Sequence, residues 1–303
     1  MTKRGAKYEG GVTSTAFAGV TALTKTLVAY LGLVVIIGWI RRHGGDISRW
    51  FVELGCGLNV AKFSGSLVVN LLSAAVVLLY ARASGVRVKD MGLKGGKAVG
   101  YYVAGAAISC GMIALIAFLC YTMGDVRFVG FGIDGAIPIE LLAVMVLSMT
   151  NVREELLFRG WMMGELRGRI PAWAVVAVSS LIFGLSHLGN PHVTTLAVVN
   201  LVLLGLFWAL CLLSTGSLWM VMAMHSFWNF AQSRVVGLPV SGGKMPTEAV
   251  VQLAPSGEGA FPLGPFGLEG SPVATVVIIT AIVSLGIIWR YNRRMAPLRK
   301  MMK

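Results

Sequence analysis

Charged side chains, and acidic ones above all, are scarce in this chain. Only 13% of its 303 residues are charged, and 13 acidic residues stand against 26 basic ones, which gives a formal net charge of +13 at pH 7. Hydrophobic residues make up 56% of the chain, and the mean hydropathy is +0.77. This shortage of charge argues against a soluble domain and indicates a polytopic membrane protein.

The chain also lacks a basic stripe with interleaved aromatic residues, which is the pattern that binds a nucleic acid strand. Its basic residues flank apolar runs instead, as the positive-inside rule requires of a membrane protein. We therefore expect the lipid bilayer, and no nucleic acid, as the partner of the basic residues.

Cysteine pairs with the spacing of a metal or redox site are absent. The four cysteines lie far apart and three fall within apolar runs, so we expect free, buried thiols. An HExxH sequence, which places two zinc ligands on one helix, is also absent. The first apolar run is too long for a signal peptide and has no clear small-residue cleavage site, so we expect it to be retained as a helix.

The sequence contains many long apolar runs. Each is near the roughly 20 residues that cross the hydrocarbon core of a bilayer. The sequence therefore predicts an all-α, polytopic membrane helix bundle of about eight transmembrane helices, with residues 1–303 as a single integral-membrane domain. The predicted helices cover about residues 18–40, 63–81, 98–121, a run that begins near 137 and continues into the charged stretch 151–160, 172–188, 194–213, 218–236 and 273–289.

The basic residues are unevenly shared between the two sides of this predicted bundle. With both termini in the cytoplasm, 18 of the 26 basic residues lie on inner segments and six on outer segments. The positive-inside rule therefore predicts that both termini are cytoplasmic. We expect the plasma membrane of a bacterium. Residues 237–272, rich in glycine and proline, are predicted to be an ordered loop or partial lid outside the hydrocarbon.

Four charges in seven residues follow the fourth apolar run directly. Ionisable residues at membrane depth cost roughly 2.5–3.5 kcal/mol each on insertion scales, so they are usually paired, inward-facing and functional. On a helix, Glu155 and Arg159 are four residues apart and can form an ion pair. Glu154 lies about 100° round the helix from Glu155 and must have other neighbours. We expect Glu155 to serve the structure and Glu154 the chemistry; the alternative is an ion-pair cluster at an interfacial helix end.

Two later motifs place polar side chains in apolar surroundings. Phe183 and His187 form an FxxxH pattern near the end of the predicted fifth helix, and His225 and Asn229 form an HxxxN pattern within the seventh. His225 and Asn229 are one turn apart, so they project from one face. Because lipid offers none of these groups a hydrogen-bond partner, we expect them to converge on one polar pocket. The alternatives are a backbone hydrogen bond for His187 and interhelical hydrogen bonds for His225 and Asn229.

A pocket with a carboxylate, two imidazoles and a carboxamide has the groups that hydrolysis needs. A glutamate can take a proton from a water molecule that a histidine orients. A second histidine and an asparagine can donate hydrogen bonds to the oxyanion of a tetrahedral intermediate. Two histidines and a carboxylate could instead hold zinc with an open fourth position. The residues by themselves leave both mechanisms open.

Taken together and in this order, the three motifs resemble the signature of the CAAX protease and bacteriocin-processing family of intramembrane proteases. That family includes the Ras-converting-type CAAX endopeptidases. Its pattern is EExxxR, then FxxxH, then HxxxN or HxxxD, and every anchor position is filled in this chain. The resemblance covers about residues 137–231, which would be the catalytic core, and the layout of eight helices is also similar.

The resemblance implies a role for each site residue. Glu154 would be the catalytic base and His187 its partner in activating water, while His225 and Asn229 would stabilise the oxyanion. It also implies a glutamate-dependent mechanism without a metal or other cofactor, and a membrane-associated peptide or protein as the substrate. Supporting roles would belong to Glu155, Arg159 and Phe183.

We therefore predict an intramembrane endopeptidase that hydrolyses a peptide bond of a membrane-associated protein or peptide. The first alternative is a catalytically inactive scaffold or bacteriocin-immunity protein that uses the same polar pocket for binding. The second is a small transporter, and the lack of an evident internal repeat speaks against it. Nothing in the sequence distinguishes a prenylated C-terminus from a bacteriocin leader as the substrate.

Overall fold

The computed structural model describes residues 9–132, 151–246 and 249–301. Its elements are helices apart from one two-stranded sheet, which confirms the predicted all-α membrane helix bundle. By its internal contacts the chain divides into two compact units. The first unit consists of residues 1–91 and 156–176, and the second unit consists of residues 92–155 and 177–303. Whether the chain acts as a single membrane domain stays a prediction.

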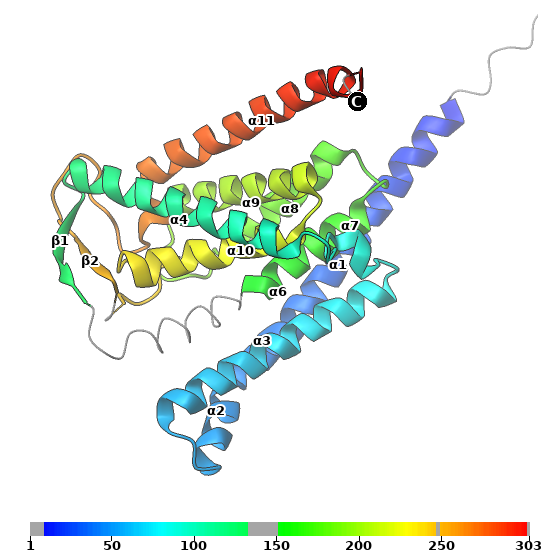
Figure 1. Cartoon of the computed structure of the whole chain (residues 1–303). Helices are drawn as coiled ribbons and strands as arrows, with labels where there is room; N and C mark the ends of the chain where they lie inside the picture. The colour runs from blue at the N-terminus through cyan, green and yellow to red at the C-terminus, as the bar shows by residue number, and fades with distance from the viewer. Residues whose placement is uncertain (1–8, 133–150, 247–248, 302–303) are drawn as a thin grey trace, which may run out of the picture. The chain divides into compact units, whose positions relative to one another are not determined.

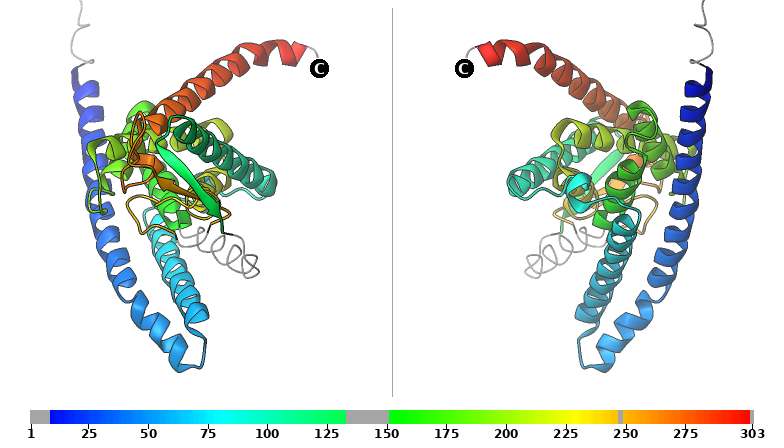
Figure 2. Two further views of the ribbon diagram at one scale, coloured as in Figure 1. Left: turned by 90° about the vertical axis from the view of Figure 1, so that its left-hand side faces the viewer. Right: turned by 90° about the vertical axis from the view of Figure 1, so that its right-hand side faces the viewer.

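The first unit is built on two long helices. Helices α1 (Glu9–Arg42) and α3 (Leu58–Ala83) lie side by side and are joined through the short helix α2 (Gly44–Glu53), as Figure 2 shows. Helix α3 ends where Gly85 takes a positive φ of 89°, a conformation that glycine adopts without a steric penalty. The amide of Val86 can then bond back to the carbonyl of Ala81 at 2.8 Å.

Three short elements complete the first unit: the 3-10 helix η1 (Val88–Met91), the π-helix η3 (Leu156–Met162) and α7 (Met163–Leu166). Large side chains from η3 pack on the two long helices. The ring of Phe158 lies 5.7 Å from that of Tyr30 on α1, and Trp161 lies edge-on to Tyr80 on α3 at 5.4 Å. The Trp161 indole also donates to the Ser84 hydroxyl at 3.2 Å, which ties η3 to the end of α3.

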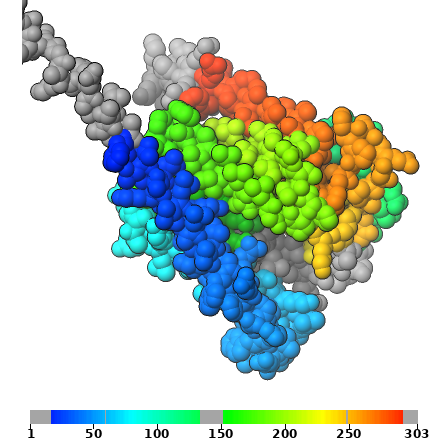
Figure 3. Space-filling view, turned by 180° about the vertical axis from the view of Figure 1, so that it is seen from behind, coloured from blue at the N-terminus to red at the C-terminus, as the bar shows by residue number. Residues whose placement is uncertain are grey.

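The second unit contains the remaining long helices. Figure 1 shows α4 (Ala98–Thr122) beside α10 (Leu218–Phe230), and α9 (Thr195–Thr215) beside α11 (Pro272–Met301). In the space-filling view of Figure 3, α11 runs along α9 on the surface. Helices α6 (Val152–Glu155) and α8 (Ala172–Leu185) bring the motif residues to this unit. Helix α4 can approach α10 closely because Gly105 presents no side chain to it.

Five spans in the described part of the chain are long and apolar enough to cross a membrane, which supports an integral membrane protein. Helix α8 is apolar but shorter, with 14 residues, and the 13-residue α10 continues as the π-helix η4 (Ala231–Val235). Every predicted helix except the fourth coincides with a described helix. Most of the fourth lies within residues 133–150, outside the described residues. The five spans are Phe17–Glu53, Val60–Ala83, Ala98–Thr122, Thr195–Thr215 and Pro272–Tyr291.

A small antiparallel sheet was not predicted from the sequence. Strand β1 (Val126–Phe131) follows α4 and pairs with β2 (Val251–Pro255). Strand β2 lies within the glycine-rich and proline-rich segment after α10, which also contains the 3-10 helix η5 (Leu268–Gly270). That this segment is a loop or partial lid outside the hydrocarbon stays a prediction. No local sequence pattern predicts that β1 pairs with β2, because the two strands are far apart in the chain and each is short.

Candidate functional site

The centre of the candidate site is a buried pair formed by Glu155 and His225. Oε1 of Glu155 lies 2.8 Å from Nδ1 of His225, and the two side chains are 0% and 5% exposed. The pair joins α6 to α10 within the second unit. A hydrogen-bonded pair so fully removed from water is expensive to break, because the remaining partner is left buried without its counterpart.

His225 was not the partner that the sequence predicted for Glu155. The prediction was Arg159, from the i,i+4 spacing of an α-helix. From Leu156 onward the chain forms a π-helix, in which hydrogen bonds run to the fifth residue. Arg159 is 1% exposed and belongs to the first unit. The Glu155–Arg159 pair stays a prediction.

Aromatic rings enclose the two motif histidines. Trp208 of α9 stacks on the His225 imidazole with ring centres 4.4 Å apart and an interplanar angle of 27°. Phe183 of α8 meets His225 edge-on at 5.7 Å and His187 edge-on at 4.9 Å. The phenylalanine of the FxxxH motif is therefore a common neighbour of both imidazoles, and it is fully buried.

Trp208 is a site residue that sequence reasoning missed. It lies in the apolar run of the predicted sixth helix, and no motif marks it. The indole covers one face of the imidazole and, together with the Glu155 carboxylate at Nδ1, fixes the orientation of the His225 ring.

His187 lies just beyond the end of α8 and is partly buried. Its Nδ1 atom is 2.8 Å from the carbonyl oxygen of Phe183 and 3.3 Å from the Ser186 hydroxyl. Because a carbonyl only accepts, Nδ1 carries the proton, and in the neutral ring Nε2 is then an acceptor. The backbone hydrogen bond that the sequence suggested as an alternative is present. Because this bond keeps the proton on Nδ1, Nε2 can accept a hydrogen bond from water.

Glu154 differs from its neighbour Glu155 in its surroundings. Its Oε1 atom lies 3.2 Å from Nη2 of Arg153, and its side chain is 23% exposed. Glu155 has no exposed surface at all. The two adjacent carboxylates therefore do not share one environment, and only Glu154 keeps contact with the outside of the protein.

Asn229 lies one turn beyond His225 on α10. Within the described part of the chain its side-chain amide makes no hydrogen bond, while its backbone oxygen accepts one from the Ser233 hydroxyl at 2.8 Å. The amide is partly exposed. It can therefore donate to a group that enters the site from the side of His225.

A second buried carboxylate, Glu269 of η5, holds the loop before α11 against α10. The Trp228 indole donates to Oε1 of Glu269 at 3.0 Å, and the backbone amide and hydroxyl of Ser241 donate to Oε2 at 2.8 and 2.6 Å. The Asn190 amide, three residues after His187, donates to the carbonyl of Ser241 at 3.1 Å. Sequence reasoning missed this network, which fixes the helix that carries His225 and Asn229.

Among the described residues, no three His, Cys, Asp or Glu side chains come together as a set that could hold a metal ion, so the zinc set suggested by the sequence is not such a cluster. That set was Glu154, His187 and His225. The four cysteines are free, and two of them, Cys120 and Cys211, are buried.

Comparison with known proteins bears on the segment that carries the motifs. Residues 137–231 match the protein family described as type II CAAX prenyl endopeptidase Rce1-like. The matched segment contains the three motifs and Trp208, whereas Glu269 lies beyond it. In the comparisons with curated proteins and with solved structures, nothing matches this chain.

Proposed function

Because residues 137–231 match the Rce1-like CAAX endopeptidase family, we propose that this protein is an endopeptidase that cleaves a membrane-associated peptide or protein with a water molecule activated by Glu154 and His187. The family match supports intramembrane protease activity in general, and the long apolar helices support an integral membrane protein. The roles of the individual residues are our proposal.

The observation that carries the proposal is the buried Glu155–His225 pair beside Phe183 and His187. An imidazole held by a carboxylate at Nδ1 has its ring orientation and its tautomer set. In the proposed site Nε2 of His225, the ring nitrogen that does not face Glu155, is the donor to the oxyanion, and the stacked Trp208 holds the ring in place. A donor that is fixed in advance in a buried site is the arrangement that stabilises an oxyanion.

The reaction we propose begins with water held by the acceptor Nε2 of His187. Glu154 takes a proton from this water, and the resulting hydroxide attacks the carbonyl carbon of the scissile peptide bond. The carbonyl oxygen becomes an oxyanion that accepts hydrogen bonds from His225 and Asn229. When the C–N bond breaks, the proton held by Glu154 goes to the departing amine, and the carboxylate is restored.

Replacing each of the adjacent glutamates by glutamine tests these roles. Glu154→Gln keeps size and shape but removes the base, so we expect normal folding and a loss of turnover of about 10²–10⁴-fold. Glu155→Gln removes the charge that holds His225 in a fully buried site, so we expect a loss of about 1–3 kcal/mol of stability as well as a loss of activity. The measurements are purified yield, melting temperature in detergent and cleavage rate.

Two results would count against this assignment. If Glu154→Gln cleaves at the wild-type rate while Glu155→Gln is stable and inactive, the two carboxylates have the opposite roles. If wild type and Glu154→Ala leave a broad peptide library equally untouched, the pocket serves binding, as in a scaffold or immunity protein. Comparing membrane and secreted peptides by mass spectrometry, with and without the protein, identifies the substrate.

We also propose that the protein lies in a bacterial plasma membrane with both termini in the cytoplasm. The support is the distribution of basic residues, 18 on segments of one side and six on segments of the other. Lys and Arg near helix ends resist transfer across the membrane, so the richer side remains inside.

A further inference from the structure

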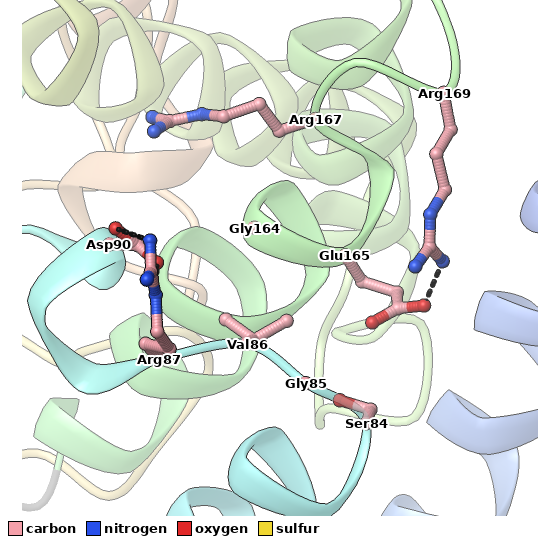
Figure 4. Close-up of a pocket in the computed structure, with 9 residues that line it drawn as sticks. All are labelled: Ser84, Gly85, Val86, Arg87, Asp90, Gly164, Glu165, Arg167 and Arg169. Atoms are coloured by element: carbon pink, nitrogen blue, oxygen red, sulfur yellow. Dashed lines mark hydrogen bonds and ion pairs between the residues drawn. The ribbon is translucent and has the colours of Figure 1, made fainter.

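A charged pocket in the first unit is lined by none of the motif residues. It has a volume of about 410 Å³ and is bordered by the turn after α3 and by the segment from α7 onward, as Figure 4 shows. Small-molecule sites have volumes of roughly 300–1,000 Å³, so this pocket can hold a ligand. Its charged lining residues are Arg87, Asp90, Glu165, Arg167 and Arg169.

Two glycines give the pocket its form. Gly168 has a positive φ of 74°, which turns the chain so that the arginines on both sides of it line the same cavity. At Gly164 an added Cβ would lie 2.8 Å from Cγ1 of Val86. The stiff, branched valine cannot move aside easily. The close approach of α7 to the turn after α3 therefore depends on glycine.

The pocket has one positive charge in excess, and its arginines differ in their partners. Arg87 bonds to Asp90 through Nε–Oδ2 at 2.6 Å and Nη2–Oδ1 at 3.3 Å, and Arg169 pairs with Glu165. In the part of the chain that the structure describes, the Arg167 guanidinium has no hydrogen bond or ion pair. Figure 4 shows it extended toward the side of the pocket that Asp90 occupies.

The pKa of the Asp90 carboxyl is consistent with these pairings. This pKa lies below the ordinary value, first because of the hydrogen bond from Arg87, with smaller contributions from the charges of Lys89 and Arg167. Asp90 is therefore ionised at neutral pH and occupies Arg87. The positive charge left over for an incoming anion is that of Arg167.

The position of the pocket along the chain restricts the anion it would meet. The candidate span Val60–Ala83 ends four residues before Arg87, and the apolar helix α8 begins three residues after Arg169. The lining arginines thus follow or precede apolar helices directly. Residues in such places lie at the boundary between lipid and water, where the phosphates of the lipid headgroups are found.

We propose that this pocket binds the phosphate of an anionic phospholipid headgroup, with Arg167 as its main ligand and Arg87 and Arg169 beside it. A guanidinium offers paired N–H donors that match two phosphate oxygens, and such charge-assisted bonds are about twice as strong as neutral ones. A zwitterionic headgroup brings a cationic amine toward three arginines and is disfavoured. The pocket therefore selects anionic over zwitterionic lipid.

The test is a lipid titration of the full-length protein in mild detergent, with melting temperature as the readout. Short-chain phosphatidylglycerol should raise the melting temperature more than phosphatidylcholine of the same chain length. Arg167→Gln should weaken the apparent affinity for phosphatidylglycerol roughly tenfold, as expected for losing a charge-assisted contact. Arg82→Gln is the matched control, since it removes the same charge from the exposed last turn of α3, outside the pocket.

A variant that binds phosphatidylglycerol more tightly gives a second test, because misfolding would weaken binding and could not strengthen it. Asp90→Asn removes the carboxylate that occupies Arg87, so phosphatidylglycerol should bind several-fold more tightly. The proposal is overturned if Arg167→Gln behaves like Arg82→Gln, if Asp90→Asn does not tighten binding, or if the two lipids are equivalent. It is also overturned if inorganic phosphate at equal concentration displaces the lipid and raises the melting temperature as much, because the ligand is then the free ion.

Discussion

The contact between α4 and α10 predicts opposite effects of alanine at two glycines of α4. One substitution should lower the stability of the protein and the other should raise it. An added Cβ at Gly105 would lie 2.3 Å from the carbonyl oxygen of Met220 and 3.2 Å from Cβ of Ala223. The carbonyl oxygen belongs to the backbone and cannot rotate away, so Gly105→Ala must push α4 and α10 apart. Overpacking of this kind costs about 1–3 kcal/mol.

Alanine also brings a benefit that must be subtracted. In a helix interior it is more stable than glycine by roughly 0.5–1 kcal/mol. The contact at 2.3 Å with a backbone atom puts the overpacking cost at the upper end of its range. We therefore expect Gly105→Ala to destabilise the protein by about 2 kcal/mol net. Because α10 carries His225 and Asn229, the displacement should also lower the cleavage rate.

Gly111 of the same helix provides the matched control. Nothing lies within 4 Å of the position that its Cβ would take. Gly111→Ala should therefore retain the helical benefit without the clash and raise stability by roughly 0.5–1 kcal/mol. Melting temperatures and denaturant unfolding in one detergent, with cleavage rates alongside, measure both variants. If both change stability in the same direction, or Gly105→Ala is as stable as wild type, α4 and α10 do not approach as described.

Two further predictions concern the chemistry and the orientation. Cleavage should survive chelation; stoichiometric zinc whose removal abolishes activity and whose return restores it would instead support a metal held by Glu154, His187 and His225. A cysteine introduced at either terminus should resist an impermeant thiol reagent added to intact cells and react after lysis, whereas labelling from outside would reverse the predicted topology.

Much of the fold followed from local properties of the sequence. A long apolar run in a bilayer can satisfy its backbone only as a helix, so hydropathy alone located α1, α3, α4, α9 and α11. The shorter α8 and α10 were also located, with ends that differ by a few residues. Helical spacing alone put His225 and Asn229 on one face of α10, and motif order identified the family, because each is a property of neighbours along the chain.

Partners that are distant along the chain were decided by the tertiary structure alone. Spacing predicts Arg159 as a partner of Glu155, whereas only the packing of α6 on α10 brings His225, 70 residues away, to the same carboxylate. The packing of α9 on α10 sets Trp208 against His225, and the fold of the glycine-rich loop before α11 brings Glu269 to the indole of Trp228. The sequence determined which polar side chains had to be buried within the protein, since lipid offers none of them a hydrogen-bond partner. The partner each one found depended on which helices pack together, and no local pattern encodes that choice.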